Sequence, residues 1–476
     1  MISRRPLLIG AAAAGLIALP AFAQTGSGFE GEWNGALNAG PQTLRLHLVI
    51  EAGPRATVFS VDQGNARIAA DNVQINGAAI SMSFPSVNAS YRGTLANGRI
   101  TGQFTQGQTF PLEFTPGPAP AAGAGVAPMP PPPPMQHMSQ DVLSGLRVQS
   151  GAPAMACAAR STNGRHIAFA DGLRSASGRT PVTTQDQWHL GSMTKSMTAT
   201  LVGRMVDAGR VSWNDTVGGV LGSVIPDIRA EYRDVSFRHL LCHRAGLQPN
   251  IPMERMGEFQ RENPDPRQER IAWSRIALTM DPVGPKETAF AYANNGFIIA
   301  GTMLEVKCGA KWEDLITAQV FNPLGMRSAG FGAPGTPGHL DQPVGHAQGP
   351  AGPHTPYPPG GPISDNPAVL GPAGRVHATL EDVLTFCGAH RDRTALLLPQ
   401  TWDTLHTPPF GGDYAMGWIK HEGRFWHNGS NTLFYTEMAF DTATGVVCAA
   451  ACNDGNLDAV TPQVRTALRD AGFSVI

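Results

Sequence analysis

The sequence predicts a chain of two domains: an all-β antiparallel barrel or sandwich over residues 24–115, and an α+β domain over residues 138–476. Three observations lead to this prediction. Apolar and polar residues alternate through the first segment, which is the pattern of half-buried strands. A proline-rich stretch, residues 116–137, separates the two segments. Beyond it, helical and strand periodicities are mixed, and 476 residues exceed what one compact core usually supports.

The first 23 residues have the features of a targeting segment. Ser3-Arg4-Arg5-Pro6 resembles a twin-arginine export signal, an apolar run follows it, and Ala21-Phe22-Ala23 fits a cleavage site. We therefore expect residues 1–23 to be a twin-arginine-type signal peptide and the mature protein to be periplasmic or secreted. The alternative is an uncleaved anchor, but the run is shorter than the ~20 apolar residues of a membrane helix. No other segment is long enough to span a bilayer, so we expect no stable membrane span in the mature form.

Residues 24–115 alternate in a way that defines several strands. Leu44, Leu46, Leu48 and Ile50 alternate with more polar residues, and the segment from Ile80 to Phe84 repeats the pattern. Asn-Gly turns follow at short intervals, as in antiparallel hairpins. The segment carries no acid pair, Cys/His cluster or nucleophile motif. We expect this all-β accessory domain to bind a ligand, to pack against the second domain, or to support oligomerisation.

Residues 116–137 change abruptly to proline, alanine and glycine, with five consecutive prolines at 130–134. Such a composition cannot form a core and favours the polyproline II conformation. We interpret the stretch as a linker between the domains. The alternative is a proline-rich ligand for an aromatic groove.

Charge and cysteine content exclude some classes of partner. The chain has 35 basic and 37 acidic residues, so nothing indicates a nucleic acid or an anionic membrane as a partner. Six cysteines are present, at spacings that suggest no disulfide framework. Cys448 and Cys452 lie about 13 Å apart on a predicted strand, too far to bond each other. We expect buried free thiols, and the sequence carries no signal for an oligomeric state.

The stretch that carries chemistry is Gly191-Ser192-Met193-Thr194-Lys195, in a chain with only five lysines. It opens a predicted helix, and helical positions i and i+3 share a face. A lysine that has lost its proton can then activate the serine hydroxyl as a nucleophile. The alternative is that Ser192 only caps the helix.

The remaining elements of the second domain follow from periodicity. Apolar residues recur at helical spacing from Met193 to Val206, and Gly209 is a plausible end of that helix. The segment 295–306 is apolar nearly all round and predicts a buried helix. A long stretch rich in Gly and Pro, residues 332–374, is expected to border or cover the active site. The other predicted elements are a hairpin of 153–159 and 165–171, a helix at 380–389, strands at 414–420, 424–427, 435–440 and 446–453, and a closing helix at 461–471.

Two further motifs follow Ser192 along the chain. Tyr292-Ala293-Asn294 lies about 100 residues after Ser192, and His427-Asn428-Gly429 ends a predicted strand near the C-terminus. With S-x-x-K, they resemble the serine β-lactamase and penicillin-binding-protein-like hydrolases, in the branch of class C β-lactamases, DD-peptidases, D-aminopeptidases and related esterases. Residues 239–247, 321–326 and 372–379 resemble further landmarks of that family. The resemblance covers residues 138–476 and implies a β-lactamase/transpeptidase-like fold: an antiparallel sheet with flanking helices and a helical lobe.

The resemblance also implies roles for individual residues. Ser192 would be the nucleophile, with Lys195 or Tyr292 as its base. Asn294, His427 and Gly429 would bind or orient the substrate, and Asn294 would also orient Lys195. The oxyanion would be bound by the backbone N–H groups of Ser192 and Ser430. We expect Gly429 to be required because a side chain there would stop the substrate from lying along the strand.

The sequence departs from the β-lactamase pattern at one position. Those enzymes usually carry Lys-Thr-Gly where this chain has His427, and a neutral histidine supplies no fixed charge for a substrate carboxylate. Arg375 could replace that charge. We therefore expect an exported serine hydrolase that cleaves a small ester or amide, including a D-amino-acid peptide. The alternatives are a true β-lactamase or DD-peptidase, and a non-catalytic protein that binds cell-wall peptide.

We expect neither a cofactor nor a metal. His239 and His243 have the i, i+4 spacing of a metal pair, but no third ligand is evident and the segment matches a family landmark. No G-x-S-x-G motif indicates an α/β-hydrolase, and no phosphate-binding glycine loop occurs.

Overall fold

The computed structural model describes residues 28–118 with short gaps (40–41, 52, 54, 61–65, 85–88 and 107), and residues 137–348 and 352–473. The expected signal peptide and most of the proline-rich linker lie outside these residues. Contacts divide the chain into two compact units, Met1–Pro131 and Pro132–Ile476. We describe each unit by itself and call them the N-terminal and the C-terminal unit.

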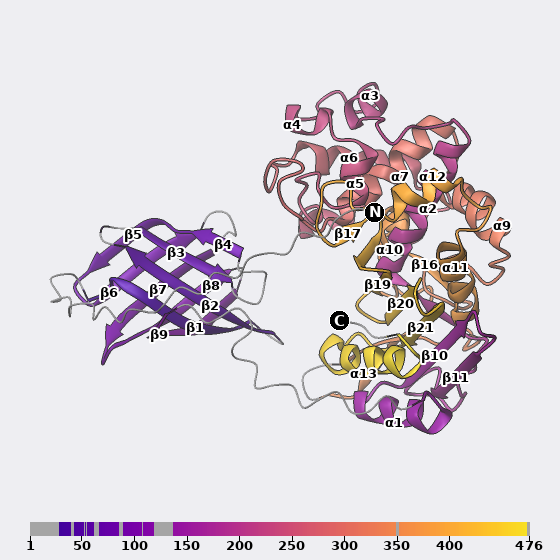
Figure 1. Cartoon of the computed structure of the whole chain (residues 1–476), viewed down its shortest axis with the longest axis horizontal. Helices are drawn as coiled ribbons and strands as arrows, with labels where there is room; N and C mark the ends of the chain where they lie inside the picture. The colour runs from indigo at the N-terminus through magenta and orange to yellow at the C-terminus, as the bar shows by residue number, and fades with distance from the viewer. Residues whose placement is uncertain are drawn as a thin grey trace, which may run out of the picture. The chain divides into compact units, whose positions relative to one another are not determined.

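The described residues of the N-terminal unit form one antiparallel sheet of nine strands in the order β4-β3-β2-β1-β9-β8-β7-β6-β5 (Figure 1). The sheet curls until β3 contacts β5, so it approaches a closed barrel. Alternate residues such as Leu46, Leu48 and Ile50 point into a filled apolar core. The predicted antiparallel barrel is therefore confirmed. The strands are β1 (Gly31–Ala39), β2 (Gln42–Glu51), β3 (Arg55–Ser60), β4 (Ala66–Ala69), β5 (Asp71–Asn76), β6 (Ala79–Phe84), β7 (Ala89–Ala96), β8 (Arg99–Gln106) and β9 (Gln108–Pro116).

The C-terminal unit is built on an antiparallel sheet whose order, among the described residues, is β11-β10-β21-β20-β19-β18-β17. The predicted hairpin and the predicted C-terminal strands all belong to this sheet. Its strands are β10 (Ala154–Ser161), β11 (His166–Gly172), β17 (Tyr414–Ala415), β18 (Trp418–His421), β19 (Arg424–Ser430), β20 (Tyr435–Asp441) and β21 (Val446–Cys452). Two small sheets complete the strands: β12 (Gln187–His189) with β16 (Val376–Thr379) and β13 (Gly330–Phe331), and β14 (Gly345–Gln348) with β15 (His354–Tyr357).

Helices cover both faces of this sheet. α1 (Gln140–Ser150) and α13 (Leu457–Asp470) lie side by side on one face (Figure 1) and share an apolar cluster with β10, β20 and β21. α2 (Thr194–Asp207) and α11 (Leu380–Asp392) belong to the larger core on the other face. α2 is buried along most of its length because its apolar positions span a wide face. The chain thus has the predicted α+β architecture with flanking helices.

The remaining helices form the predicted helical lobe and its connections. Within the described ranges, no helix is both long and apolar enough to cross a membrane. The helices are α3 (Val217–Leu221), α4 (Ala230–Arg233), α5 (Phe237–Leu241), η4 (Met253–Glu258), α6 (Arg267–Thr279), α7 (Asn294–Cys308), α8 (Trp312–Ile316), the π-helical η5 (Thr317–Phe321), α9 (Asn322–Leu324), η6 (Ala368–Leu370), α10 (Gly371–Gly374) and α12 (Pro399–Leu405).

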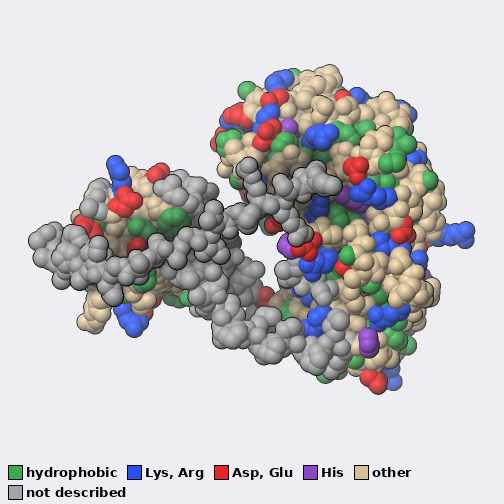
Figure 2. All heavy atoms as spheres, in the orientation of Figure 1, with side chains coloured by type: hydrophobic (Ala, Val, Ile, Leu, Met, Phe, Trp, Pro, Cys, Tyr) green, Lys and Arg blue, Asp and Glu red, His purple; other side chains and the backbone are tan. Residues whose placement is uncertain are grey.

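Surface charge and cysteines agree with the composition. Acidic and basic side chains are interspersed over the face of the C-terminal unit that Figure 2 shows, as expected from nearly balanced totals. The six cysteines all lie in the described part of this unit and form no disulfide. Cys157, Cys387 and Cys448 are fully buried, and burial raises the pKa of each thiol.

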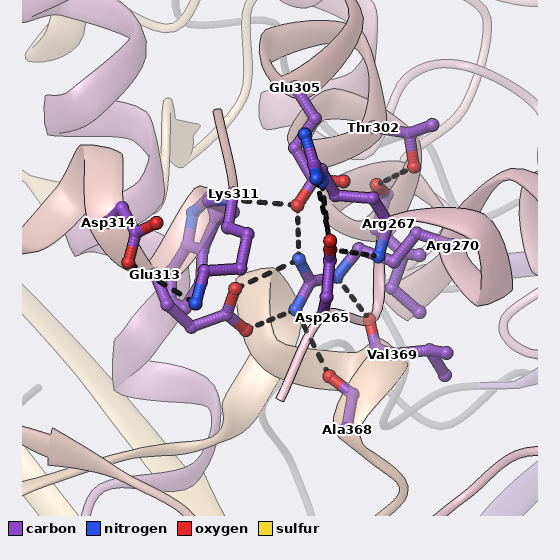
Figure 3. A network of polar contacts seen from close by, with 12 residues as sticks. Asp265, Arg267, Arg270, Thr302, Glu305, Lys311, Glu313, Asp314, Ala368 and Val369 are labelled. Carbon is purple, nitrogen blue, oxygen red and sulfur yellow. Dashed lines mark hydrogen bonds and ion pairs between the residues drawn. The ribbon is translucent and has the colours of Figure 1, made fainter. Parts of the chain in front are cut away.

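A buried arginine connects the helices α6, α7 and α8 to η6, the short turn that leads into α10. Arg270 on α6 is fully buried and pairs with Glu305 of α7 and Glu313 of α8 (Figure 3). It also donates to the carbonyls of Ala368 at 3.1 Å and Val369 at 3.2 Å, in η6. η6 runs directly into α10, so Arg270 helps to fix the position of α10.

Replacing Arg270 with alanine is expected to destabilise the protein by about 3–5 kcal/mol, because it leaves Glu305 and Glu313 without their buried partner. Urea unfolding measures this loss. Arg275→Ala on the same helix is the matched control, since the Arg275–Asp227 pair is largely exposed. That control should cost about 1 kcal/mol or less. Equal losses for the two variants would contradict a structural role specific to the buried network.

Two neutral histidines are packed together in the core of the same unit. His390 Nδ1 lies 2.9 Å from His406 Nε2, and the His390 ring contacts Trp402 and Trp418. Burial lowers the pKa of His390 well below its usual value and lowers that of His406 to about 3. Both imidazoles are therefore neutral in the folded protein across the neutral and mildly acid range.

This pair predicts loss of stability in mild acid. In the unfolded chain both histidines take up protons below about pH 6.5, whereas the folded chain resists doing so. Their stabilising contribution is present above that pH and is lost as the pH falls. Protonation of the two histidines in the unfolded chain should lower the free energy of unfolding by roughly 2–3 kcal/mol between pH 7 and pH 5.5. Denaturant unfolding at the two pH values measures the loss, and His406→Gln should reduce it by about 1 kcal/mol, because other buried histidines such as His427 still contribute. An unchanged pH dependence in that variant would contradict this assignment.

Candidate active site

Ser192 lies in the short 3₁₀ turn η3 (Gly191–Met193), which leads directly into α2. Lys195 Nζ lies 2.9 Å from Ser192 Oγ, as the shared face of one helical turn predicts. Met193 occupies the position before α2, and no side chain caps that helix. The geometry therefore places Ser192 against Lys195 and gives it no capping contact.

Lys195 is completely buried, and this burial holds the pKa of its amine well below the usual value. Nζ lies 2.7 Å from Asn294 Oδ1 and 2.7 Å from the carbonyl oxygen of Ala373. Both of these oxygens only accept hydrogen bonds. A neutral amine has two N–H groups and one lone pair, so with both N–H groups used its lone pair faces Ser192 Oγ. Lys195 is thus arranged to accept the serine proton.

Tyr292 contacts the same oxygen from another side. Its hydroxyl donates to Ser192 Oγ at 2.8 Å. The residue is 36% exposed and lines the cavity, and burial raises the pKa of its hydroxyl to about 12. Tyr292 therefore keeps its proton at neutral pH and is arranged as a donor.

The position of Tyr292 is fixed by His243. The His243 carbonyl accepts from the N–H of Ala291 at 2.9 Å, and Nδ1 accepts from the N–H of Ala293 at 3.0 Å. The imidazole also lies 4.3 Å from the Tyr292 ring, centroid to centroid. His243 thus holds the residues on both sides of Tyr292 as well as its ring.

Asn294 is the first residue of α7, and its side chain bridges two polar groups. Nδ2 donates to Asn250 Oδ1 at 2.9 Å, which directs Oδ1 toward Lys195. This contact matches the expected orientation of Lys195 by Asn294.

His427 on β19 is buried and neutral. Burial and nearby Lys195 lower its pKa to about 3. Nδ1 lies 2.6 Å from the carbonyl oxygen of Asn428, which can only accept, so the ring proton is on Nδ1. Nε2 therefore accepts from the Tyr414 hydroxyl at 2.9 Å. This histidine supplies no positive charge to the site.

Gly429 and Gly191 let two backbone segments meet. A Cβ at Gly429 would lie 2.0 Å from the carbonyl oxygen of Leu190 and 2.7 Å from the nitrogen of Ser192. A Cβ at Gly191 would lie 2.3 Å from the nitrogen of Ser430. The expected reason for Gly429, room for the substrate, is therefore incomplete, because glycine is already required for β19 to pack against the nucleophile turn. The N–H groups of Ser192 and Ser430 lie on these two adjoining segments.

A cavity of about 730 Å³ opens at Ser192. Ser192, Tyr292, His427, Gly429 and Ser430 line it, and so do residues that sequence reasoning did not identify. These additional residues are Arg244, Phe290, Gly412, Asp413, Tyr414, Ile419 and Asn428. Arg244 lies within residues 239–247, which resemble a family landmark, and this resemblance was the sequence signal for it. In the structure it follows His243, whose φ is 60°. Nothing local in the sequence indicated Phe290 or Tyr414.

The segment 332–374 borders the site as expected, because Ala373 accepts from Lys195, but none of its described residues lines the cavity. Another expectation about the site is wrong. Arg375 does not replace the missing charge in the cavity, because it pairs with Asp365 and Glu262. The charged residues that do line the cavity are Arg244 and Asp413.

The two histidines considered as a metal pair serve other contacts. α5 ends at Leu241 and His243 lies beyond it, so the two side chains do not share a helical face. His239 contacts Ser236 and Glu287, and His243 Nδ1 is occupied by the N–H of Ala293. Across the described ranges, no group of three or more His, Cys, Asp or Glu side chains could hold a metal ion.

Comparisons with known proteins bear on the family and the fold. A family model described as Beta-lactamase matches residues 139–473. Penicillin-binding protein 4 of Amycolatopsis lactamdurans is 27% identical over 340 residues, which cover 66% of this chain and 84% of that protein. The D-amino acid amidase of Ochrobactrum anthropi SV3 has a TM-score of 0.55 at 20% identity, covering 69% of this chain and 97% of that one. EstCE1, a hydrolase with promiscuous acyltransferase activity, has a TM-score of 0.57 at 18% identity, covering 70% and 97%.

Proposed function

Because the chain belongs to the beta-lactamase family, we propose that this hydrolase cleaves a small ester or amide through an acyl-enzyme on Ser192. One observation carries the proposal. Ser192 Oγ, in the wall of an open cavity, is contacted both by a buried lysine at 2.9 Å and by a tyrosine hydroxyl at 2.8 Å. A nucleophile with a proton acceptor on one side and a proton donor on the other is suited to acyl transfer.

Acylation starts with the neutral Lys195. Its lone pair takes the proton of Ser192 Oγ while Oγ attacks the carbonyl carbon of the substrate. The negative charge that develops on the carbonyl oxygen is stabilised by the N–H groups of Ser192 and Ser430. The bond to the leaving group then breaks, and the leaving group takes a proton from Tyr292, which recovers one from Lys195. In the second half water attacks the ester of Ser192, and Lys195 again accepts the proton. The bond between the acyl carbon and Oγ then breaks, and Lys195 returns the proton to Oγ as the acid leaves.

The walls of the cavity favour a substrate with an apolar acyl or amine portion. Phe290, Tyr292, Tyr414 and Ile419 supply aromatic and aliphatic surface. The neutral His427 offers no charge where β-lactamases use a lysine, which supports esters and amides over substrates that depend on a carboxylate at that point. The similarity to a D-amino acid amidase supports D-amino-acid amides or peptides as one substrate class. The segment 1–23 supports export, with hydrolysis in the periplasm or outside the cell.

Intact-protein mass spectrometry tests this proposal. Wild type and Ser192→Ala are incubated with a fluorophosphonate, and separately with a penicillin. A single fluorophosphonate adduct on wild type that the variant lacks supports an activated Ser192. A persistent penicillin adduct would instead favour DD-peptidase chemistry, and rapid turnover of penicillin would favour a β-lactamase. If neither reagent reacts and no ester or amide is hydrolysed, the proposal of an enzyme fails. The hypothesis to test next is then a non-catalytic protein that binds cell-wall peptide.

A further inference from the structure

A buried carboxylate that takes no part in the proposed proton transfers lies behind the catalytic serine. Asp365, in the segment 332–374, is 3% exposed. Both carboxylate oxygens accept hydrogen bonds, and His189 Nε2 lies between them, 3.0 Å from Oδ1 and 3.1 Å from Oδ2. Oδ2 accepts from His189 Nε2 and Arg375 Nε, each at 3.1 Å, and Oδ1 accepts from Asn431 Nδ2 at 3.1 Å and the N–H of Asn366 at 2.8 Å. Burial alone would raise the pKa of Asp365, but His189 and Arg375 outweigh it and hold the pKa below its usual range.

One of these donors connects Asp365 to the nucleophile turn. His189 is fully buried at the end of β12, and its Nδ1 accepts from the N–H of Gly191 at 3.1 Å. Because Nδ1 accepts, the ring proton is on Nε2, which is the atom that faces Asp365. Gly191 has φ 49° and directly precedes Ser192. The path from Asp365 through His189 therefore ends one residue before the first oxyanion donor.

A second donor connects Asp365 to the other segment of the oxyanion site. Asn431 directly follows Ser430 and is 3% exposed. While its Nδ2 donates to Asp365, its Oδ1 accepts from the N–H groups of Leu433 at 3.2 Å and Phe434 at 3.0 Å. The Phe434 ring in turn stacks on His189, with 6.1 Å between centroids. The turn after Ser430 is thus tied to the same carboxylate.

We propose that Asp365 is a positioning residue that sets the separation of the two backbone segments carrying the oxyanion donors, through His189 on one side and Asn431 on the other. This inference rests on the proposed function, in which the N–H groups of Ser192 and Ser430 stabilise the oxyanion. The two segments are more than 230 residues apart in the sequence. The carboxylate of Asp365 binds one side chain from each: His189, three residues before Ser192, and Asn431, directly after Ser430. Oxyanion stabilisation depends on donors that are already aligned, and a misplacement of about 1 Å can cost about 10²-fold in rate.

Asp365 is itself held in place from the side opposite the serine. Arg375 binds Asp365 through Nε and Glu262 through an amino group at 2.8 Å, and Arg261 donates to the Asp365 backbone carbonyl. Glu262 is 67% exposed, so it touches the network only at its outer end. Glu262→Gln is therefore a matched control: it removes a carboxylate from Arg375 without changing the contacts of Asp365.

The test variant is Asp365→Asn. Asparagine keeps the shape of the side chain but turns one acceptor oxygen into an N–H donor, so one pair of donors must face another donor. With p-nitrophenyl butyrate as substrate, we expect kcat to fall about 10²-fold while KM stays within about threefold. The inhibition constant of phenylboronic acid, which forms a tetrahedral adduct on the serine, should rise by a similar factor. Glu262→Gln should leave both quantities within about threefold of wild type.

Two substitutions of His189 separate the links of the first path. His189→Asn keeps an acceptor near the position of Nδ1 for Gly191 but is too short to reach Asp365. His189→Gln keeps a donor toward Asp365 and loses the acceptor for Gly191. Both should lower kcat and boronate affinity together. Asp365 and His189 act in series. The double variant Asp365→Asn, His189→Asn should therefore have a kcat only slightly lower than that of the more damaged single variant, and the two fold-losses in kcat should not multiply.

Failure of this inference is distinguishable from failure of the proposed function. If wild type neither hydrolyses the ester nor binds the boronate, the proposed function fails. If wild type is active and folded Asp365→Asn keeps kcat and boronate affinity within threefold, only the role of Asp365 is overturned. If kcat of Asp365→Asn falls without a matching loss of boronate affinity, the positioning role of Asp365 is overturned as well. If Asp365→Asn does not fold, His189→Asn and Asn431→Asp decide by the same two measurements, since Asn431→Asp keeps Oδ1 for Leu433 and Phe434 and repels Asp365.

Discussion

Replacing Ser192 with alanine is expected to lower turnover of an ester or amide substrate by about 10⁴-fold or more, with the fold intact. The loss follows from removal of the only oxygen that both Lys195 and Tyr292 contact within the described site. The fold should survive because Ser192 caps no helix and its side chain faces the cavity. Steady-state kinetics measures the loss, and circular dichroism and thermal unfolding establish that the variant is folded.

Ser430→Ala is the comparison that separates a hydroxyl from a backbone role. The proposed function of Ser430 uses its N–H, while its hydroxyl oxygen only accepts from the N–H of Thr432 at 2.9 Å. That variant should therefore lose less than about tenfold in kcat. Full activity of Ser192→Ala would rule out the acyl-enzyme mechanism, and an equally large loss in Ser430→Ala would show that the hydroxyl of Ser430 has a chemical role.

Replacing Lys195 with methionine is expected to lower kcat/KM by about 10³–10⁴-fold. Methionine fills similar space but has no lone pair that can take the serine proton. Arginine should not restore activity, because it stays protonated at every accessible pH. In the wild type, kcat/KM should fall as the pH drops, because protonation of Lys195 removes the acceptor. Its lowered pKa means that activity is already developed well below the pH at which an ordinary lysine loses its proton. This acid limb should be absent from the residual activity of Lys195→Met.

The same variant should be more stable than the wild type at neutral pH. In the unfolded chain Lys195 is protonated below about pH 10.4, while the folded state favours the neutral amine, so protonation favours unfolding. Methionine removes this destabilising contribution. A melting temperature that rises while activity collapses would support a neutral buried Lys195. A fall in melting temperature with retained activity would contradict both parts of the prediction.

Local patterns predicted the elements that hold the catalytic side chains. The hairpin of β10 and β11, the buried helix α7 and the start of α2 near Ser192 follow from periodicity and turn residues, which depend on neighbours in the sequence. The motif Y-x-N is positioned as its resemblance implied, because Tyr292 and Asn294 flank the start of α7 and both reach the Ser192–Lys195 pair.

The sequence failed where function depends on contacts between distant segments. Residues 332–374 have no periodicity, so composition alone predicted that they border or cover the active site and could not show from which side. Their contribution comes from beneath the site, through Asp365 and Ala373. Arg375 was misplaced for the same reason: its position within the landmark 372–379 does not show which buried carboxylate it pairs with. Tyr414 was missed because its contact with His427 spans a β-hairpin and leaves no motif.

The burial of Lys195 also bears on how this chain tolerates sequence drift. A side chain that weakens the folded state at neutral pH is replaced readily when nothing selects for it, because many apolar substitutes would strengthen the fold. The amine of Lys195 contacts two carbonyl oxygens and a serine hydroxyl. An apolar substitute would make none of these contacts. The contacts of its amine, and not the packing of α2, therefore distinguish Lys195 from an apolar substitute. A descendant freed from catalysis should lose Lys195 early, while the apolar face of α2 persists.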